Sequence, residues 1–282
     1  DFSYSVTAML FDYTSVYTKY NNPTGTLSTI YEGQKAGEIW GYKTIGLIQT
    51  QEQADEINAT RRQNFISGQV WKKGDVMYAD LNDDNVIDKG KNTINDHGDW
   101  NVIGNTTPRY QFGLTLTANW KGFDVRAFFQ GTGKRDLWLS GNMFWGFSQW
   151  NQSSLFPHHM DYYRDTEGDL YSGLGLNTDA YFPRPYSNGT TDGKNKQQQT
   201  RYLQDGSYIR LKNLQIGYSL PKSLLKKMRI QDMRVYVSGE NIWTKTSLSP
   251  GFDPETANMG QLGNGKSMFT QAVYAVGFNV SF

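Results

Sequence analysis

Cysteine is absent from the 282 residues of this chain, which excludes a disulfide framework and a thiolate metal site. Long apolar runs are missing too: no stretch reaches the roughly 18 apolar residues that a membrane-spanning helix needs. This test leaves membrane β-strands open, because their apolar residues alternate with polar ones. Net charge is only +1, from 28 basic and 27 acidic residues, so no overall field predicts binding to nucleic acid.

Aromatic residues and glycine are abundant instead. Aromatic residues make up 15% of the chain and glycines number 29, whereas prolines number only 8. Mean hydropathy is nevertheless negative. This combination favours aromatic side chains spread over surfaces and interfaces, with many turns between strands, rather than a thick aliphatic core.

Alternation of apolar and polar residues is the clearest pattern. In residues 111–120, QFGLTLTANW, five apolar side chains share one face. Residues 123–131 alternate again after Lys121 and Gly122, which predicts a β-hairpin with a two-residue turn. The phase of a further strand changes near Lys212, which predicts a β-bulge. About seven strands are expected in all; the other five are 2–10, 38–48, 207–220, 233–243 and 272–282.

The connections between these strands are unequal in length. Two are short, at 121–122 and between 220 and 232, whereas three are long and polar: 49–108, 132–200 and 245–269. Loops this long argue against a compact soluble domain. Short turns at one end and long loops at the other are typical of an outer-membrane barrel. A soluble β-sandwich is the alternative, but aromatic residues near the expected strand ends favour the barrel, whose interfaces carry aromatic girdles.

The stretch ADLNDDNVID, residues 79–88, has the oxygen spacing of a calcium-binding loop. Calcium takes six to eight oxygen ligands, and an EF-hand loop supplies them from alternate positions. The expected ligands are Asp80, Asn82, Asp84, the main-chain carbonyl of Val86, and Asp88.

Two positions depart from the calcium-loop pattern. Asn85 stands where glycine is usual, which is tolerable because asparagine visits the left-handed conformation. Lys91 stands where a bidentate acid is expected. A distant acid would then have to complete the site, and the candidates are Asp75, Asp96 and Asp99. The alternative is an acidic turn solvated by water.

The long segment 132–200 carries aromatic side chains in a polar setting. Such side chains stack on sugar rings or peptide side chains, and the alternative is that they pack the loop onto its neighbours or onto a partner. The candidates for ligand contact are Trp138, Phe144, Trp145 and Trp150.

No catalytic constellation is found in the sequence. Adjacent His158 and His159, on a strand, would point to opposite faces and so would not share a metal. We therefore expect neither an enzyme nor an organic cofactor, and calcium is the one ion that the residues favour.

Four stretches, in the same order and nearly end to end, resemble the C-terminal part of SusC-like (RagA-like) TonB-dependent outer-membrane transporters of Bacteroidetes. Residues 37–53 resemble a glycine-aromatic strand of that family, and 74–88 its acidic loop. Residues 102–133 resemble its hairpin, and 207–246 the strand, turn and strand near its end. The resemblance implies an all-β fold: the C-terminal segment of a 22-stranded transmembrane antiparallel β-barrel, with long extracellular loops and short periplasmic turns.

The resemblance also implies a function and partners. It implies a place in the bacterial outer membrane and TonB-dependent import of oligosaccharides or peptides together with a SusD-like surface lipoprotein. Nothing in residues 1–282 resembles the plug domain or the TonB-contacting segment. About seven strands cannot close so large a barrel, so the outer two are expected to pair with the rest of the barrel. Expected partners are therefore the remaining barrel and plug, the lipoprotein, TonB, outer-membrane lipid and the transported ligand, but not nucleic acid.

The competing hypothesis is a secreted, calcium-stabilised β-sandwich that binds glycans through its tryptophan-rich loop. The two differ in where the apolar faces of 111–120 and 272–282 lie. A barrel needs an outward apolar belt about 25 Å tall, whereas a sandwich buries these faces against each other.

Overall fold

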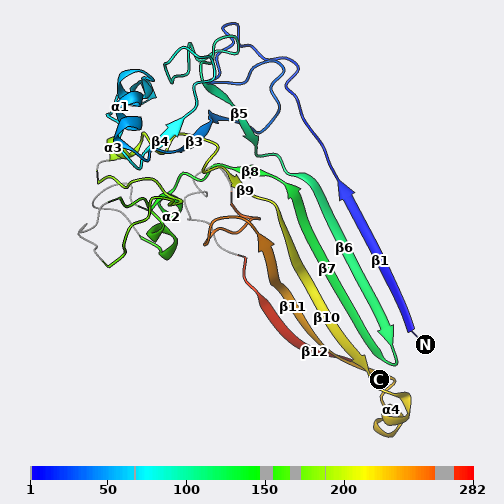
Figure 1. Cartoon of the computed structure of the whole chain (residues 1–282). Helices are drawn as coiled ribbons and strands as arrows, with labels where there is room; N and C mark the ends of the chain where they lie inside the picture. The colour runs from blue at the N-terminus through cyan, green and yellow to red at the C-terminus, as the bar shows by residue number, and fades with distance from the viewer. Residues whose placement is uncertain (1, 67, 147–154, 166–172, 188, 258–269) are drawn as a thin grey trace.

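The computed structural model describes the whole chain except residues 1, 67, 147–154, 166–172, 188 and 258–269. Its main feature is a six-stranded antiparallel sheet in the order β1-β6-β7-β10-β11-β12 (Figure 1). The strands are β1 (Phe2–Phe11), β6 (Arg109–Trp120), β7 (Phe123–Lys134), β10 (Tyr208–Ser219), β11 (Asp232–Thr246) and β12 (Val273–Ser281). Each strand pairs with the next strand of the sheet along the chain, so the sheet is a simple meander.

Six of the seven strands expected from the sequence lie in this sheet. The seventh, 38–48, is extended as expected, but it is divided into two strands that lie outside the sheet. That segment forms β2 (Glu38–Tyr42) and β3 (Thr44–Leu47). These pair with β5 (Trp100–Asn105) and β4 (Val76–Tyr78), outside the main sheet. Ile39 and Tyr42 are an odd number of positions apart, so their side chains point to opposite faces of β2, and both are buried. A strand that is buried on both faces belongs in a packed core and not in the main sheet, whose apolar face is exposed.

The predicted turn and the predicted bulge are both confirmed. Lys121 and Gly122 join β6 to β7 with φ of 48° and 89°, and positive φ at both central residues matches the right-handed twist of a tight hairpin. The register of β10 with both neighbouring strands shifts between Leu211 and Asn213.

One face of the sheet is apolar from edge to edge. Along one row of the register, Val6, Leu116, Ala127 and Leu214 lie side by side on four successive strands. These side chains are uncovered: at the two edges, Tyr4 is 73% exposed and Val276 is 79% exposed. An exposed apolar face of this extent indicates contact with a lipid phase or a partner.

The length of the strands suits a bilayer. The twelve residues of β6 extend for about 40 Å at 3.3 Å per residue. Tilted by about 45°, such a strand rises about 28 Å, which exceeds the roughly 25 Å apolar band of an outer-membrane barrel.

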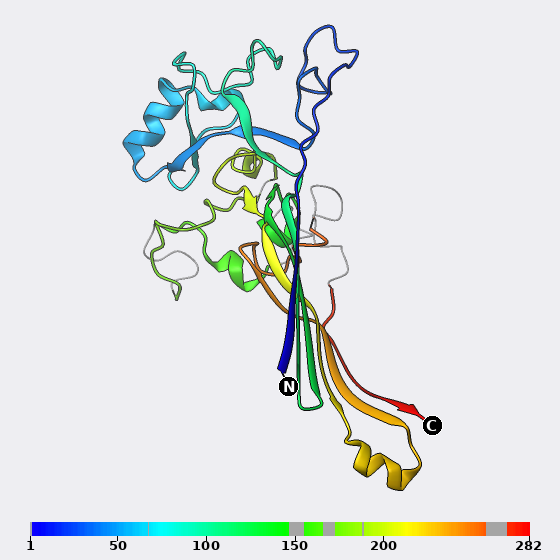
Figure 2. The same cartoon turned by 90° about the vertical axis from the view of Figure 1, so that its right-hand side faces the viewer.

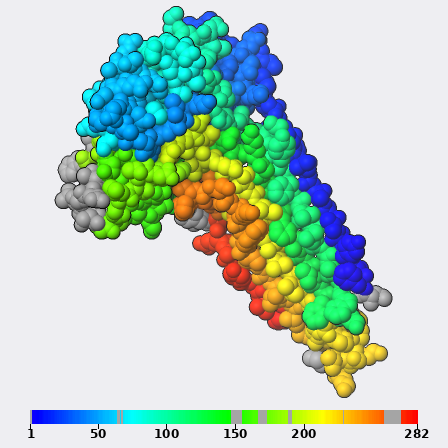
Figure 3. All heavy atoms as spheres, viewed as in Figure 1, coloured from blue at the N-terminus to red at the C-terminus, as the bar shows by residue number. Residues whose placement is uncertain are grey.

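The long connections, residues 12–108, 135–207 and 247–272, all leave the sheet at one end (Figures 1 and 3). Their described residues pack into what we call the loop lobe. Among the described residues, the connections at the opposite end are the turn at 121–122 and the short segment with helix α4 (Lys222–Met228). The asymmetry expected from the sequence is therefore confirmed. The lobe holds β2 to β5, α1 (Gln51–Ala59), η1 (Gln63–Ile66), β8 (Asp136–Leu137), α2 (Asn142–Trp145), η2 (Pro157–Met160), α3 (Gly189–Asp192) and β9 (Gln204–Asp205).

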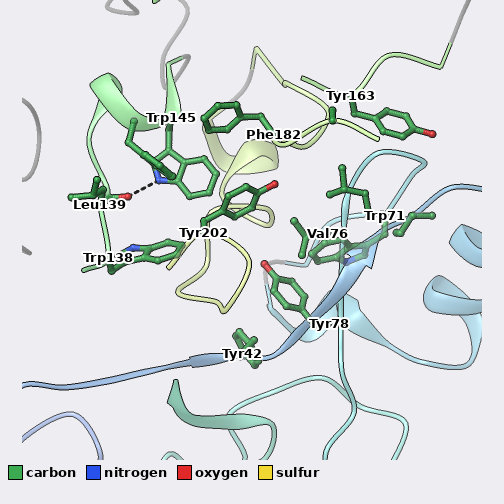
Figure 4. Close-up of a cluster of buried hydrophobic side chains, with 14 of the residues drawn as sticks. Tyr42, Trp71, Val76, Tyr78, Trp138, Leu139, Trp145, Tyr163, Phe182 and Tyr202 are labelled. Atoms are coloured by element: carbon green, nitrogen blue, oxygen red, sulfur yellow. Dashed lines mark hydrogen bonds between the residues drawn. The ribbon is translucent and has the colours of Figure 1, made fainter. Parts of the chain in front are cut away.

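The buried core lies in the loop lobe and not against the sheet. Aromatic rings dominate it: Tyr42 and Trp100 have centroids 4.8 Å apart. Trp71 and Tyr78, both drawn in Figure 4, have centroids 5.8 Å apart. The aromatic residues that the sequence places in polar loops are thus what holds those loops together. In the described part of the chain, no helix is long and apolar enough to cross a membrane.

Candidate functional site

A cluster of charges joins the polar face of the sheet to the loop lobe. Arg210 of β10 is nearly buried, and its guanidinium lies 2.9 Å from carboxylate oxygens of both Asp253 and Glu255. Lys212 lies 3.0 Å from Glu255. The connection after β11 therefore folds down beside the strands, on the side opposite the apolar face. Figure 2 shows the lobe displaced to one side of the sheet.

A fully buried ion pair joins the first long connection to the second. Lys194 Nζ lies 2.5 Å from Asp75 Oδ2, and neither side chain has any exposed surface. Asp75 Oδ1 also accepts hydrogen bonds from the Tyr186 hydroxyl at 2.9 Å and from Asn195 Nδ2 at 2.8 Å. Lys194 donates to the main-chain carbonyl of Val70 at 2.7 Å. Both charges have hydrogen-bond partners, so the pair holds the two connections in one relative position. Removing one of the two side chains would leave a buried charge unpaired and lower the stability of the lobe.

The acidic loop 79–88 is curled by two left-handed residues and by hydrogen bonds from its main chain to its own carboxylates. Asp83 and Asn85 have φ of 58° and 63°, so Asn85 takes the left-handed conformation expected of it. The Asn85 amide donates to Asp80 Oδ2 at 2.8 Å, and the Val86 amide donates to Asp84 Oδ1 at 2.7 Å. The other carboxylate oxygen of Asp80, Oδ1, is buried and has no hydrogen-bond partner among the described residues.

Asp99 is the distant acid that reaches this loop. Its Oδ1 accepts from the Leu81 amide at 2.6 Å and its Oδ2 from the Asp88 amide at 3.2 Å, so one carboxylate holds both ends of the loop. Burial raises the pKa of Asp99, and the negative charges of Asp80 and Asp84 raise it further. The carboxylates of Asp80 and Asp84 are therefore near enough to Asp99 to disfavour its negative charge.

The other two candidate acids are engaged elsewhere. Asp75 is in the buried pair with Lys194, and Asp96 lies 3.4 Å from Lys91. Within the described ranges, no group of three or more histidine, aspartate or glutamate side chains could hold a metal ion. The five expected ligands Asp80, Asn82, Asp84, Val86 and Asp88 thus lie in one curled loop, and calcium at this loop stays a prediction.

Three of the four aromatic candidates are in the lobe core. Trp138, Phe144 and Trp145 are buried, whereas Trp150 lies outside the described residues. Trp145 donates from Nε1 to the Leu139 carbonyl at 3.0 Å (Figure 4). Packing, the alternative that the sequence left open, accounts for the burial of all three.

Trp145 is also part of a cavity wall. It lines an apolar cavity of about 290 Å³ together with Met160, Leu174 and Phe182. Direct contact of the aromatic candidates with a ligand stays a prediction.

The histidine pair is arranged differently from the expectation. His158 and His159 lie in the 3-10 helix η2, and their ring centroids are 4.0 Å apart. Successive side chains of such a helix are separated by about 120° and not by 180°, so the expected opposite orientation is wrong. Nε2 of each ring lies within hydrogen-bonding distance of the Met143 carbonyl, at 2.9 and 3.1 Å. Burial lowers the pKa of His159, which favours its neutral form.

Comparisons with curated proteins find TonB-dependent receptors. The chain is 31% identical over 229 residues to TonB-dependent receptor P3 of Formosa agariphila, which covers 79% of this chain and 19% of the relative. It is 24% identical over 261 residues to TonB-dependent receptor P26 of the same organism, covering 89% of this chain and 23% of that relative. The chain therefore spans about a fifth of the length of these curated relatives. No family model matches.

Comparisons with solved structures find the same architecture. The structure of the RagAB peptide transporter matches with a TM-score of 0.60 and 19% identity, covering 100% of this chain and 27% of that chain. The RagAB peptide importer in a closed-closed state matches with a TM-score of 0.61 and 20% identity, covering 100% of this chain and 28% of that one. At such identity these matches establish the fold alone. Over most of its length the chain is homologous to SusC-like TonB-dependent receptors, and it has the fold of the corresponding part of a RagA-type protein.

Proposed function

We propose that this chain forms one sector of the wall, with its loops, of an outer-membrane β-barrel that imports oligosaccharides or peptides in a TonB-dependent way. The observation that carries the proposal is the apolar face that runs unbroken across six strands in register. The receptor relatives support it, and they favour transport over catalysis.

The competing β-sandwich requires the apolar faces of β6 and β12 to be buried against a second sheet. In the described residues these faces are uncovered instead, with Leu116 and Val276 both exposed. The packed core is in the loop lobe. This arrangement favours a lipid-facing wall over a secreted glycan-binding module.

The edges of the sheet support assembly with further strands. Among the strands that the structure describes, β1 pairs on one side only, with β6, and β12 pairs on one side only, with β11. Long unpaired edges invite pairing with other strands. In the proposed protein both edges pair with the rest of a 22-stranded barrel, and the polar face lines the interior beside the plug. TonB would act on that plug from the periplasm.

The loop lobe is the proposed extracellular end. It stands on the polar side of the sheet, where a ligand would enter, and it is stiffened by the buried Asp75–Lys194 pair. A SusD-like lipoprotein is the proposed partner at this end, by analogy with the two-component RagAB importers that share the fold.

We further propose that the acidic loop binds calcium and that the ion draws its oxygen ligands together, because no three acidic side chains of the described residues are already grouped to hold a metal. The left-handed Asp83 and Asn85 shape the curl, and the unpartnered Asp80 Oδ1 is an oxygen that a cation would satisfy. Calcium would supply positive charge to a loop where Asp80, Asp84 and Asp99 repel one another. Its role would be to hold the first long connection in shape.

Outer-membrane fractionation followed by copurification and mass spectrometry tests the proposed function. The expected result is that the chain is recovered only with detergent, together with the other barrel strands, a surface lipoprotein and a bound oligosaccharide or peptide. Recovery of the chain as a detergent-free soluble monomer would contradict the proposal.

A further inference from the structure

The end of the sheet opposite the loop lobe carries the densest positive charge of the chain. Between β10 and β11 the chain forms α4, and residues 221–232 contain four basic residues and one acidic residue. The excess is therefore three positive charges. The four basic residues are Lys222, Lys226, Lys227 and Arg229.

Most of this charge is not neutralised within the chain. Lys222 lies 2.6 Å from Asp232, and both side chains are more than two-thirds exposed, so this pair contributes little to stability. The other acid described at this end, Asp124, is held by Arg234. Lys226 and Lys227 are exposed to solvent. Their charges are thus directed outward and available to a partner.

The helix lies at the end of the sheet where β10 stops, and it exposes an apolar side chain there (Figure 1). Leu225 is buried, whereas Leu224 is 53% exposed. The last row of the apolar face, immediately before α4, contains Phe123 and Tyr218, whose ring centroids lie 4.6 Å apart. Exposed aromatic rings followed by basic residues are typical of a membrane–water interface.

A basic side chain also lies beside an exposed aromatic ring at the neighbouring turn of the sheet. Lys121, in the turn between β6 and β7, places its Nζ 5.2 Å from the ring centre of Trp120. Trp120 is itself half exposed on the apolar face. The ammonium of Lys121 thus lies beside an exposed indole at the end of the apolar face, a pairing of basic and aromatic side chains that suits a membrane interface.

We infer that α4 and its flanking turn form a binding surface for anionic phospholipid headgroups in the membrane leaflet at the short-turn end. Charge complementarity carries the inference, together with the position of α4 directly after β10, at the end of the apolar face. It rests on the proposed function, because that face must lie in a bilayer. Lys226, Lys227 and Arg229 contact the phosphates, and Leu224 enters the acyl boundary.

Native mass spectrometry of the purified, detergent-solubilised protein tests the inference. The protein is titrated with phosphatidylglycerol and, separately, with zwitterionic phosphatidylcholine, at low and at physiological salt. The test variant is Lys226→Gln with Lys227→Gln, since both side chains are exposed and glutamine keeps the helix propensity of lysine. The matched control is Lys19→Gln with Lys43→Gln, which removes the same charge from exposed sites at the opposite end of the sheet.

The native protein is expected to retain phosphatidylglycerol in preference to phosphatidylcholine, and added salt should weaken this preference. The test variant should bind phosphatidylglycerol about fivefold more weakly per removed charge, with phosphatidylcholine unchanged. The control should keep the native preference.

Equal retention of the two lipids by the native protein, or an unchanged preference in the test variant, would overturn the inference and leave the proposed function standing. Loss of the preference in the Lys19 and Lys43 control would also overturn it, because the effect would then belong to net charge. A protein that needs no detergent and retains neither lipid would overturn the proposed function, and the inference with it.

Discussion

Substitution of Leu116 by arginine tests whether the apolar face lies in lipid. Leu116 is in the middle of the face, and its register partners on the adjacent strands are Val6 and Ala127. In water, an arginine at an exposed strand position is expected to change the free energy of unfolding by no more than about 0.5 kcal/mol. In a bilayer, the same side chain has to be accommodated among acyl chains.

The magnitude of the effect follows from the depth of the residue. Leu116 is four residues from Trp120, which is about 13 Å along the strand and about 9 Å in depth at a tilt of about 45°. Arginine at the bilayer midplane costs about 2–4 kcal/mol. Because its long side chain recovers part of this by reaching toward the interface, we expect the lower end, about 2 kcal/mol. Loss of the contacts to Val6 and Ala127 adds up to about 1 kcal/mol.

Refolding of the protein into lipid vesicles over a urea series measures this difference. Thr115→Arg is the matched control, because its side chain is on the polar face, where its register partners are Thr7 and Phe128. We expect Leu116→Arg to lower the free energy of unfolding by about 2–3 kcal/mol relative to Thr115→Arg. Equal stability of the two variants would refute a lipid-facing wall.

Three further predictions concern the loop lobe. Lys194→Met should lower the free energy of unfolding of the lobe by about 3–5 kcal/mol, because Asp75 stays buried without its cation. Urea-dependent proteolysis measures this free energy, and a change below about 1 kcal/mol would contradict the prediction. Burial raises the pKa of Asp192 from 3.8 to about 6, so the folded protein binds this proton more tightly than the unfolded chain. The proton therefore stabilises the fold at low pH, and this stabilisation is lost as the pH rises to about 6. Asp192→Asn should therefore flatten the fall in lobe stability between about pH 4 and 6, and an unchanged pH profile would argue against this assignment. Calcium should protect residues 79–88 from protease relative to chelator, and Asp80→Ala with Asp84→Ala should abolish the difference; equal protection of the native protein in calcium and chelator would exclude the site.

The sheet could be predicted from the sequence because its determinants are local. Alternation in 111–120 fixes which face of β6 is apolar, and Lys121–Gly122 fixes the tight turn and hence the register with β7. The change of phase near Lys212 likewise locates the bulge. Each of these signals depends on neighbouring residues, so one chain is enough to find them.

The loop lobe could not be predicted because its determinants are long-range. Asp75 and Lys194 are 119 positions apart, and neither residue differs locally from a surface charge. The segment 38–48 has the composition of a sheet strand, but its partners β4 and β5 divide it into two short strands in the lobe. Trp138 and Trp145 resembled ligand contacts for the same reason, since the sequence does not show what covers them.

Nitroxide labels on single cysteines at each position from 111 to 120 test the central claim most directly, since the chain has no cysteine of its own. In membranes, we expect labels at Phe112, Leu114, Leu116 and Ala118 to collide with oxygen dissolved in lipid. Labels at the odd-numbered positions should collide with a water-soluble nickel chelate. Equal access of the nickel chelate to both sets would contradict a wall with one face in lipid.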